Sequence, residues 1–150
     1  MRIVIGCDHT GVALKVALQE TVLAEHTVID VGTDSTDSVD YPDIAKAAVA
    51  VLRRGDADRG ILICGTGVGM AIAAGRHRGI RAATCSDPYV AEMSRRHNDS
   101  NVLCLGARVV GYGMAESIVR TWLHADFDGG RHARRVEKIE GTGQGGTVAR

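Results

Sequence analysis

The sequence predicts an α/β fold in which a five-stranded parallel sheet is covered by helices on both faces. Five short apolar runs rich in β-branched residues alternate with longer helical patterns, as is typical of βα repeats. Only 3% of the residues are aromatic whereas glycine occurs 19 times, so Val, Ile, Leu and Ala must build the core. The length of 150 residues and the hydrophobic content of 45% fit one domain, which we expect over 1–140, followed by a flexible tail over 141–150.

The first half of the chain predicts two βα units. A buried strand is expected at 2–6 and a helix at 12–22, where apolar residues follow a helical spacing. The second strand is expected at 27–31. The next loop, 32–40, is rich in Asp, Ser and Thr, and it could contact a substrate or be an ordinary solvated loop. The segment 41–43 predicts a helix that begins with proline in its first turn.

The second half continues the same alternation. Asp87 follows Ser86 and precedes Pro88, a combination of N-cap and proline that predicts a helix start. The basic segment 131–138 comes after a Gly-Gly pair. The other elements expected here are a strand at 79–84, a helix through His97, a strand at 101–106 and a helix at 111–123.

The middle of the chain carries an unusual turn. The apolar run 61–63 predicts a central strand that is buried on both faces, and it ends in Cys64. Alternating glycines at 65–69 allow backbone conformations that a Cβ would forbid, and they leave N–H groups free to face a ligand. The helix formers of 70–76 predict a helix whose positive end points back at Cys64. The pattern therefore predicts a thiol beside an anion-binding turn.

Two common nucleotide-binding motifs do not fit this turn. The dinucleotide fingerprint would need a glycine three residues after Gly67, where Met70 stands, and the register that starts at Gly69 fails as well. The phosphate loop of nucleoside triphosphatases needs a lysine, and none occurs between Lys46 and Lys138.

Charge and cysteine content exclude several further classes. The 18 basic and 18 acidic residues cancel, which argues against a nucleic-acid or anionic-membrane partner. The four cysteines are scattered without a C-x-x-C pair, so neither a structural metal nor a disulfide framework is indicated. The apolar run at the N-terminus is too short for a signal peptide, and no run is long enough for a membrane span. We expect a reduced, cytoplasmic setting.

The carboxyl ends of the predicted strands carry the reactive residue types. Ligands of open α/β sheets bind at this edge, so these positions should converge. They are 7–9, 32–33, 64–69, 85–87 and 106–108. Together they offer a carboxylate, an imidazole, a thiol, free amides and a guanidinium, which suffice for proton transfer on an anionic substrate.

The chain up to about Ile139 resembles the ribose 5-phosphate isomerase B family of sugar-phosphate isomerases. The matching segments are Gly6–His9, Val39–Pro42, Ile63–Gly69, Ala73–Ala74, Gly79–Arg81, Ser94–Asn98, Gly106–Gly111 and Gly129–Val136. The resemblance implies a three-layer αβα sandwich of Rossmann type that takes a small sugar phosphate and needs no cofactor or metal. It also implies a homodimer, or a dimer of dimers, with active sites shared between subunits.

The implied reaction interconverts an aldose phosphate and a ketose phosphate through an enediolate. By position, Cys64 resembles the base that removes the C2 proton and returns it to C1. The predicted helix start and free N–H groups would favour its thiolate, which supports the assignment independently. We expect the other three cysteines, Cys7, Cys85 and Cys104, to be packing residues.

The resemblance assigns further roles around the reacting carbons. Thr66 and the amides of Gly65, Gly67, Val68 and Gly69 look like the site that holds the developing oxyanion, where one well-placed donor contributes roughly 3 kcal/mol.

Ring opening and phosphate binding complete the implied site. His97 resembles the acid/base that opens the furanose, Asp8 would assist it, and Asn98 would hold hydroxyl or enediolate oxygens. The phosphate-binding positions of the family are His9, Arg108, Arg131 and Arg135. Arg131 and Arg135 would share a helical face, although a solvated basic helix is the plainer interpretation of 131–138.

The exact substrate stays open. A second branch of the family has glutamate at the position of Met70 and glycine at that of Cys64, so this chain resembles the thiol branch. Ribose 5-phosphate is the main expectation, and allose 6-phosphate, galactose 6-phosphate or a tetrose phosphate are alternatives. A sugar-phosphate-binding regulator without catalysis is a different class that the same fold permits.

Overall fold

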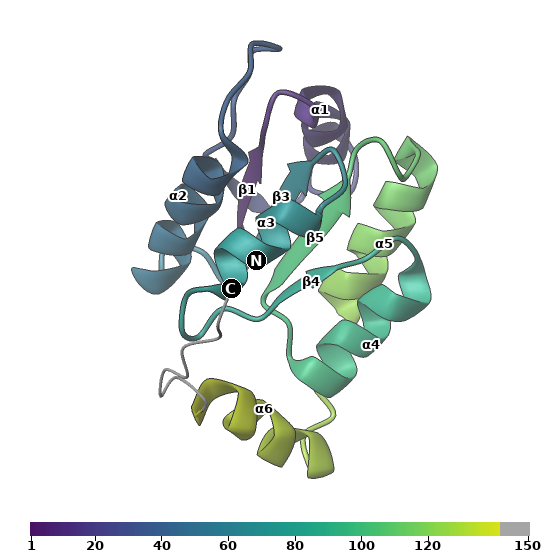
Figure 1. Cartoon of the computed structure of the whole chain (residues 1–150). Coiled ribbons are helices and arrows are strands. Elements are labelled where there is room, and N and C mark those ends of the chain that lie inside the picture. Colours follow the sequence, from purple (N-terminus) through teal and green to yellow (C-terminus); the bar gives the residue numbers. More distant parts are fainter. Residues whose placement is uncertain (142–150) are drawn as a thin grey trace.

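The structure is a computed structural model that describes residues 1–141. Of the tail expected over 141–150, Gly141 ends the last helix and the other residues lie outside the described residues. One parallel sheet has the strand order β2-β1-β3-β5-β4, which places β3 at its centre (Figure 1). The strands are β1 (Arg2–Cys7), β2 (Thr27–Asp30), β3 (Arg59–Cys64), β4 (Ala82–Thr84) and β5 (Val102–Gly106). The predicted α/β class with five parallel strands is confirmed.

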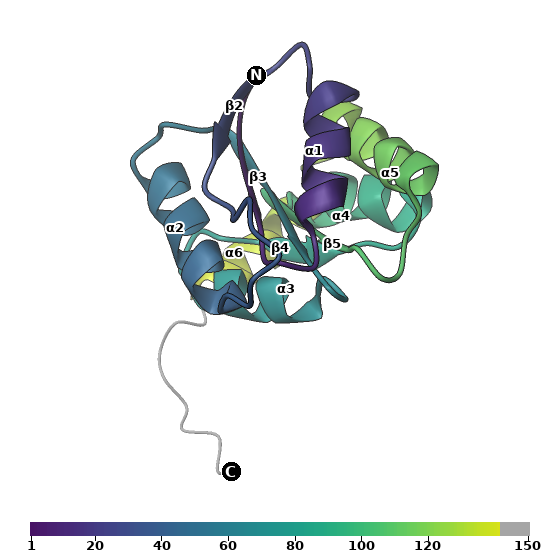
Figure 2. The ribbon, with the colours of Figure 1, turned by 90° about the horizontal axis from the view of Figure 1, so that it is seen from above.

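Helices cover both faces of this sheet. They are α1 (Val12–Glu20), α2 (Tyr41–Arg53), α3 (Val68–Gly75), α4 (Pro88–Asn98), α5 (Tyr112–His124) and α6 (Arg131–Gly141). Figure 2 shows α2 and α3 on one side of the sheet and α1, α4 and α5 on the other. Among the described residues, no helix has the length and apolar character needed to cross a membrane.

The alternation of side chains along the central strand divides the core into two. Ile61 and Ile63 pack in the cluster with α1, α4 and α5, whereas Leu62 and Cys64 pack in the cluster with α2 and α3. Each fully buried aliphatic side chain stabilises the fold by about 1.5–3 kcal/mol relative to exposure. The end of β3 therefore directs Cys64 toward α3, while its backbone continues into the glycine turn.

Two boundaries differ clearly from the predictions for local reasons, and the predicted start of the helix at Pro88 is confirmed. The fourth strand is shorter than expected because Gly79 has a positive φ of 82° and the N–H of Arg81 donates to the Asn101 side chain, so this stretch forms a turn. The helix after the glycine turn begins at Val68, since Gly67 with φ 79° serves as its N-cap. The N-cap of α4 is Asp87, whose carboxylate accepts the N–H of Val90 at 2.9 Å.

Candidate active site

A cavity of about 440 Å³ opens where the carboxyl ends of β1, β3 and β5 meet. Its lining includes these predicted site residues: Asp8, His9, Cys64, Gly65, Thr66, Val68, Gly69 and Arg108. Three loops that are distant in sequence come together here because parallel strands end at one edge of the sheet. The segment 85–87, which was also expected at this edge, does not line the cavity, because it follows the outermost strand and caps α4.

The thiol of Cys64 lies at the wall of this cavity. Its Sγ accepts a hydrogen bond from the backbone N–H of Gly67 at 3.2 Å. The left-handed conformation of Gly67 makes this bond possible, and a Cβ there would lie 3.0 Å from the carbonyl carbon of Leu105. The turn thus directs a backbone dipole at the sulfur.

The other three cysteines have different surroundings. Burial raises the pKa of the Cys7 thiol to about 11, and it raises the pKa of Cys85 to about 11 as well. Cys104 is completely buried, and its pKa is raised further by the same cause. None of the three lines the cavity.

Asp8 is buried, and its carboxylate is fixed by the next residues of the loop. Its Oδ1 accepts hydrogen bonds from the Thr10 N–H at 2.9 Å and the Thr10 hydroxyl at 2.6 Å. The N–H of Asp8 donates to the carbonyl of Ile63 on the central strand at 3.1 Å. Both side-chain bonds use one oxygen, so the second oxygen keeps its lone pairs for another donor.

His9 is oriented by the loop that connects β2 to α2. The backbone N–H of Val39 donates to Nδ1 of His9 at 3.3 Å. Since a backbone N–H can only donate, Nδ1 carries no proton, and the neutral ring holds its proton on Nε2. The loop over 32–40 therefore does more than connect two elements.

This loop is held in turn by a buried lysine. Lys15 is 1% exposed, and its Nζ lies 2.8 Å from Asp30 and 2.7 Å from Asp34. It also donates to the carbonyl of Thr33 at 3.0 Å. Burial opposes its charge, but the hydrogen bonds to the two carboxylates outweigh burial and raise the pKa of Lys15.

The glycine turn and the loop after β5 are packed on each other. Backbone N–H groups of Ala107 and Arg108 donate to the carbonyls of Cys64 at 2.8 Å and Gly65 at 3.1 Å. A Cβ on Gly65 would lie 3.7 Å from Cδ of Arg108, so this exposed guanidinium arm passes close to the turn. The cation and the thiol-bearing turn therefore border the same space.

Three lining residues were not predicted as site residues, namely Thr10, Tyr41 and Ile72. Thr10 fixes Asp8, as described above. A Cβ on Gly69 would come within 2.8 Å of the Tyr41 ring, so the glycine makes room for this ring. Tyr41 belongs to Val39–Pro42, a segment that matches the family, so the sequence offered a signal for its place in the site. Ile72 lies in no matching segment.

Five predicted residues do not line this cavity: Gly67 lies in the turn and bonds the thiol, and the other four lie elsewhere in the chain. His97 and Asn98 end α4, and Arg131 and Arg135 lie on α6, which Figure 1 shows below α4 and apart from the glycine turn. None of the four lines the cavity of Cys64. Asn98 instead borders a second hollow of about 390 Å³ with Ile80, Ala83 and Ile139. One chain by itself therefore does not bring the predicted ring-opening residue to the thiol.

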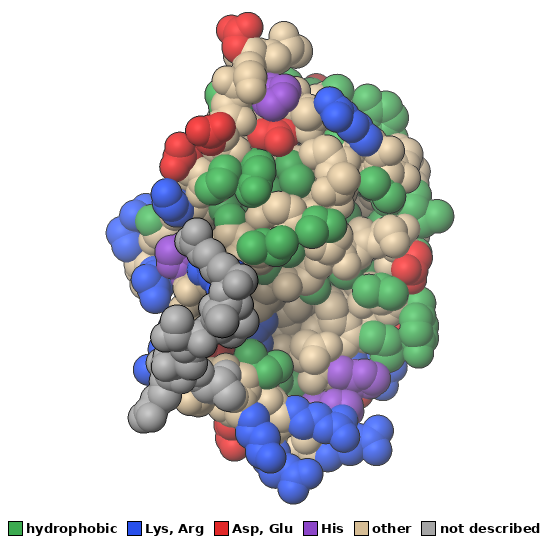
Figure 3. Space-filling model, in the orientation of Figure 1, with side chains coloured by type: hydrophobic (Ala, Val, Ile, Leu, Met, Phe, Trp, Pro, Cys, Tyr) green, Lys and Arg blue, Asp and Glu red, His purple; other side chains and the backbone are tan. Residues whose placement is uncertain are grey.

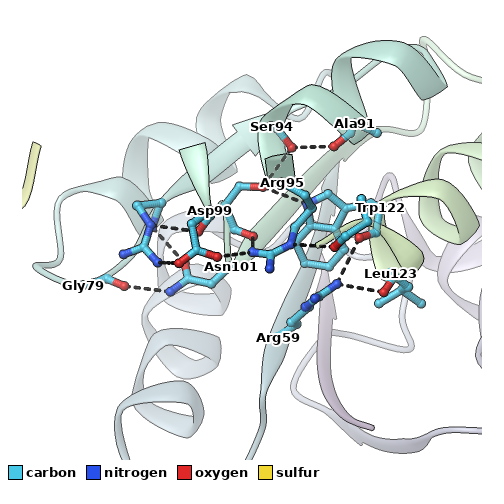
Figure 4. Close-up of polar contacts among 12 residues, drawn as sticks. Arg59, Gly79, Ala91, Ser94, Arg95, Asp99, Asn101, Trp122 and Leu123 are labelled. Carbon is cyan, nitrogen blue, oxygen red and sulfur yellow. Dashed lines mark hydrogen bonds and ion pairs between the residues drawn. The ribbon is translucent and has the colours of Figure 1, made fainter. Parts of the chain in front are cut away.

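A polar network fixes the end of α4. Arg95 donates to Asp99 at 2.7 Å and to the carbonyl of Ser100 at 2.6 Å, and Asp99 also pairs with Arg81 at 2.8 Å (Figure 4). The indole N–H of Trp122 donates to the Ser100 hydroxyl at 2.8 Å. Arg95 and Ser100 are buried, and such bonds are costly to break. The network holds the turn that follows His97.

Known proteins share this sequence and fold. The family model described as Ribose/Galactose Isomerase matches residues 3–139. Ribose-5-phosphate isomerase B of Escherichia coli is 50% identical over 139 residues, which are 92% of this chain and 93% of that protein. D-erythrulose-4-phosphate isomerase of Pectobacterium atrosepticum is 42% identical over 141 residues, 93% of either protein. The structure of ribose-5-phosphate isomerase B of Clostridium thermocellum matches with a TM-score of 0.92 at 51% identity, over 94% of this chain and 96% of that one.

Proposed function

We propose that this chain, which belongs to the ribose/galactose isomerase family, interconverts ribose 5-phosphate and ribulose 5-phosphate. Relatives that are 50% and 51% identical are named for this activity. The observation that carries the proposal is the Gly67 N–H on the sulfur of Cys64, in a cavity that also presents Asp8 and Arg108. A thiol base, a dipole and a cation in one space suit proton transfer on an anionic sugar.

Cys64 is the base in this proposal. Its thiolate takes the proton from C2 of the open-chain aldose, and the C1 carbonyl oxygen becomes an enediolate oxygen. The proton of the C2 hydroxyl moves to the C1 oxygen, C2 becomes the carbonyl carbon, and the Cys64 thiol then delivers a proton to C1. Thr66 and the amides of Gly65, Val68 and Gly69 hold the charge that develops on oxygen, whereas the N–H of Gly67 is bonded to the sulfur. No redox partner is needed, because the reaction moves hydrogen within one molecule.

The phosphate binds to side chains rather than to the glycine turn. His9 offers Nε2–H as a donor, and Arg108 adds a fixed positive charge beside the cavity. Arg131 and Arg135 are exposed one helical turn apart on α6, a spacing that suits a shared anion. They complete the phosphate site of a neighbouring copy.

A second copy of the chain supplies the groups that the cavity lacks. His97 opens the furanose ring and Asn98 holds substrate oxygens, but both lie away from Cys64 in their own chain. Three apolar residues that line the cavity, Tyr41, Val68 and Ile72, are 40–58% exposed and suit contact with this copy (Figure 3). The working unit is a homodimer, or a dimer of dimers, in the cytoplasm.

A tetrose phosphate is the second candidate substrate. Relatives that are 42% and 45% identical are named D-erythrulose-4-phosphate isomerases, so the same framework occurs with a shorter sugar. The difference would lie in how far the phosphate site is from Cys64.

The test is turnover with a panel of sugar phosphates. Purified protein is incubated separately with ribose 5-phosphate, erythrose 4-phosphate and allose 6-phosphate, and the ketose formed is measured. The proposal expects the highest kcat/KM with ribose 5-phosphate and none with Cys64→Ala. Binding of ribose 5-phosphate without any turnover would instead indicate a regulator.

A further inference from the structure

Two histidines from different elements are stacked at the far end of α4. The ring of His97 lies on the ring of His132 from α6, with centroids 4.2 Å apart and planes only 4° from parallel. His97 is half-buried, whereas His132 is only 7% exposed. The proposed mechanism uses His97 and gives no role to His132.

The surroundings of His132 keep its ring uncharged. Nε2 accepts a hydrogen bond from the Nε of Arg131 at 3.4 Å, so the proton of the neutral ring sits on Nδ1, which is buried and has no partner among the described residues. Burial lowers the pKa of His132, and the charges of His97, Arg131 and Arg135 lower it further. Asp128 acts in the opposite direction, but its carboxylate is paired with Arg96 at 3.1 Å.

A metal centre is the other interpretation of these groups. Ligand atoms of His97, Asp128 and His132 all lie within 4.8 Å of one another. Metal ligation, however, requires the lone pairs of both imidazoles to converge in the planes of their rings, and the planes of a parallel stack do not meet. Arg131 also occupies one nitrogen of His132, and Arg96 occupies one oxygen of the Asp128 carboxylate. The geometry therefore favours ring stacking over a metal.

We propose that His132 is a positioning residue for ring opening: its buried, stacked ring fixes the plane of His97, so that His97 meets the furanose bound in the neighbouring copy. This inference rests on the proposed function. In ring opening the anomeric hydroxyl loses its proton, the bond from C1 to the ring oxygen breaks, and the ring oxygen gains a proton. A group that must take and give a proton at two nearby oxygens needs a defined orientation.

The stack also suits the charge that His97 carries during this cycle. When His97 holds the transferred proton, it lies over the face of a neutral ring, which is a favourable cation–π contact. A second charge on His132 would turn this attraction into repulsion. The buried and neutral partner therefore supports both protonation states of His97 in one position.

The test compares two reactions of the same enzyme. Conversion of ribose 5-phosphate requires ring opening, whereas ribulose 5-phosphate is open-chain because its C5 oxygen carries the phosphate. Exchange of its C1 hydrogen with deuterium from D₂O, followed by NMR, therefore reports the Cys64 step alone. We expect His132→Ala to lower kcat for ribose 5-phosphate at least about tenfold, a part of the roughly 10²–10⁴-fold that a general acid–base contributes, and to leave exchange within about threefold.

Two variants complete the design. His132→Phe keeps a flat ring without a proton and should stay within about threefold of wild type in both reactions. His124→Ala, which removes an exposed histidine at the end of α5, should change neither. Equal losses of both reactions in His132→Ala, or a Phe variant as impaired as the Ala variant, would overturn the positioning role. Wild-type protein inactive in both reactions would refute the proposed function instead.

Discussion

The backbone N–H of Gly67 donates a hydrogen bond to Sγ of Cys64 across 3.2 Å, and it does so because Gly67 has a φ of +79°. In this conformation the chain turns back on the end of β3 while it starts α3. The same glycine thus begins α3 and positions the thiol of Cys64.

Gly67→Ala should impair both stability and catalysis. A Cβ there is strained by the positive φ and meets the Leu105 backbone, at a cost of about 1–3 kcal/mol in the free energy of unfolding. We also expect kcat/KM to fall about 100-fold, as for loss of one well-placed donor. Gly113→Ala in α5 is the matched control, because its Cβ would meet no atom within 4 Å and should stabilise by roughly 0.5–1 kcal/mol. Urea unfolding and steady-state kinetics measure both; a fully active Gly67→Ala protein would contradict this role.

Iodoacetamide at pH 8 should modify Cys64 first among the four cysteines. Cys7 and Cys85 have pKa values raised to about 11 by burial, so at this pH they remain protonated and unreactive. Cys64 borders the cavity, and bound ribose 5-phosphate should protect it. Peptide mass spectrometry over time identifies the labelled residue. Labelling of Cys7 as fast as Cys64 would be inconsistent with the structure.

Two inactive variants should restore activity to each other. Cys64→Ala and His97→Ala are each expected to lose isomerisation, but a mixed dimer would contain one intact site made of Cys64 from one copy and His97 from the other. Random mixing after unfolding and refolding should give about a quarter of wild-type activity, since half of the dimers are mixed and each has one working site. Activity that stays at the level of the single variants would show that sites are not shared.

Arg135→Ala should raise KM for ribose 5-phosphate by about 10-fold or more, because a charged hydrogen bond to phosphate contributes roughly 1.5–3 kcal/mol. The adjacent Arg134→Ala removes an equally exposed arginine on a different side of α6 and should leave KM within about twofold. The KM of an unphosphorylated sugar, or its kcat/KM where saturation fails, provides the second comparison. Equal effects of Arg135→Ala on both sugars would argue against phosphate contact.

The attachment of α6 should depend on pH through Glu140. Its carboxylate accepts hydrogen bonds from Arg81 at 2.7 Å and from the Gly79 N–H at 3.0 Å, and the bond to Arg81 is the main reason that the pKa of Glu140 is lowered. Because the folded pKa lies below the unfolded value of about 4.3, this stabilisation is present above that pH and is lost as pH falls through the folded pKa.

Glu140→Gln should therefore lower the free energy of unfolding at pH 7 by about 0.5–1 kcal/mol, the upper part of the range for ion pairs near the surface, because this pair is partly buried, and have little effect at pH 3. Glu137→Gln, which changes an exposed carboxylate on the same helix, is the control. Urea unfolding followed by circular dichroism at both pH values gives the comparison. An equal difference at pH 7 and pH 3 would exclude an ionic contribution.

Local sequence signals were sufficient for the central part of the site. The apolar run before Cys64 and the glycines after it specify a buried strand and a tight turn through neighbouring residues alone, so β3 and the turn could be predicted closely. The short β4 could not, because the N–H of Arg81 donates to the side chain of Asn101, which precedes β5 and is distant in sequence.

Long-range placement was harder to predict. The hydrogen bond from the Val39 N–H to His9 depends on the loop over 32–40, which Lys15 of α1 holds through Asp34. No local sequence pattern indicates either contact. His97 is separated from Cys64 because α4 follows β4, the strand at the edge of the sheet, whereas Cys64 ends the central strand. The sequence did not specify this strand order. The motifs by themselves indicated which residues matter, and the expectation that two chains share a site came only from the family resemblance.

The single tryptophan, Trp122, is bonded to the turn that follows α4, the helix that carries His97. Trp122 is completely buried, and its indole N–H is bonded to Ser100, the residue that closes the turn after α4. Its intrinsic fluorescence is therefore an internal reporter of one defined place, with emission at short wavelength while the turn is intact. Substitutions at His97 or His132 that disturb the end of α4 will shift this emission, and substitutions that alter only chemistry will leave it unchanged.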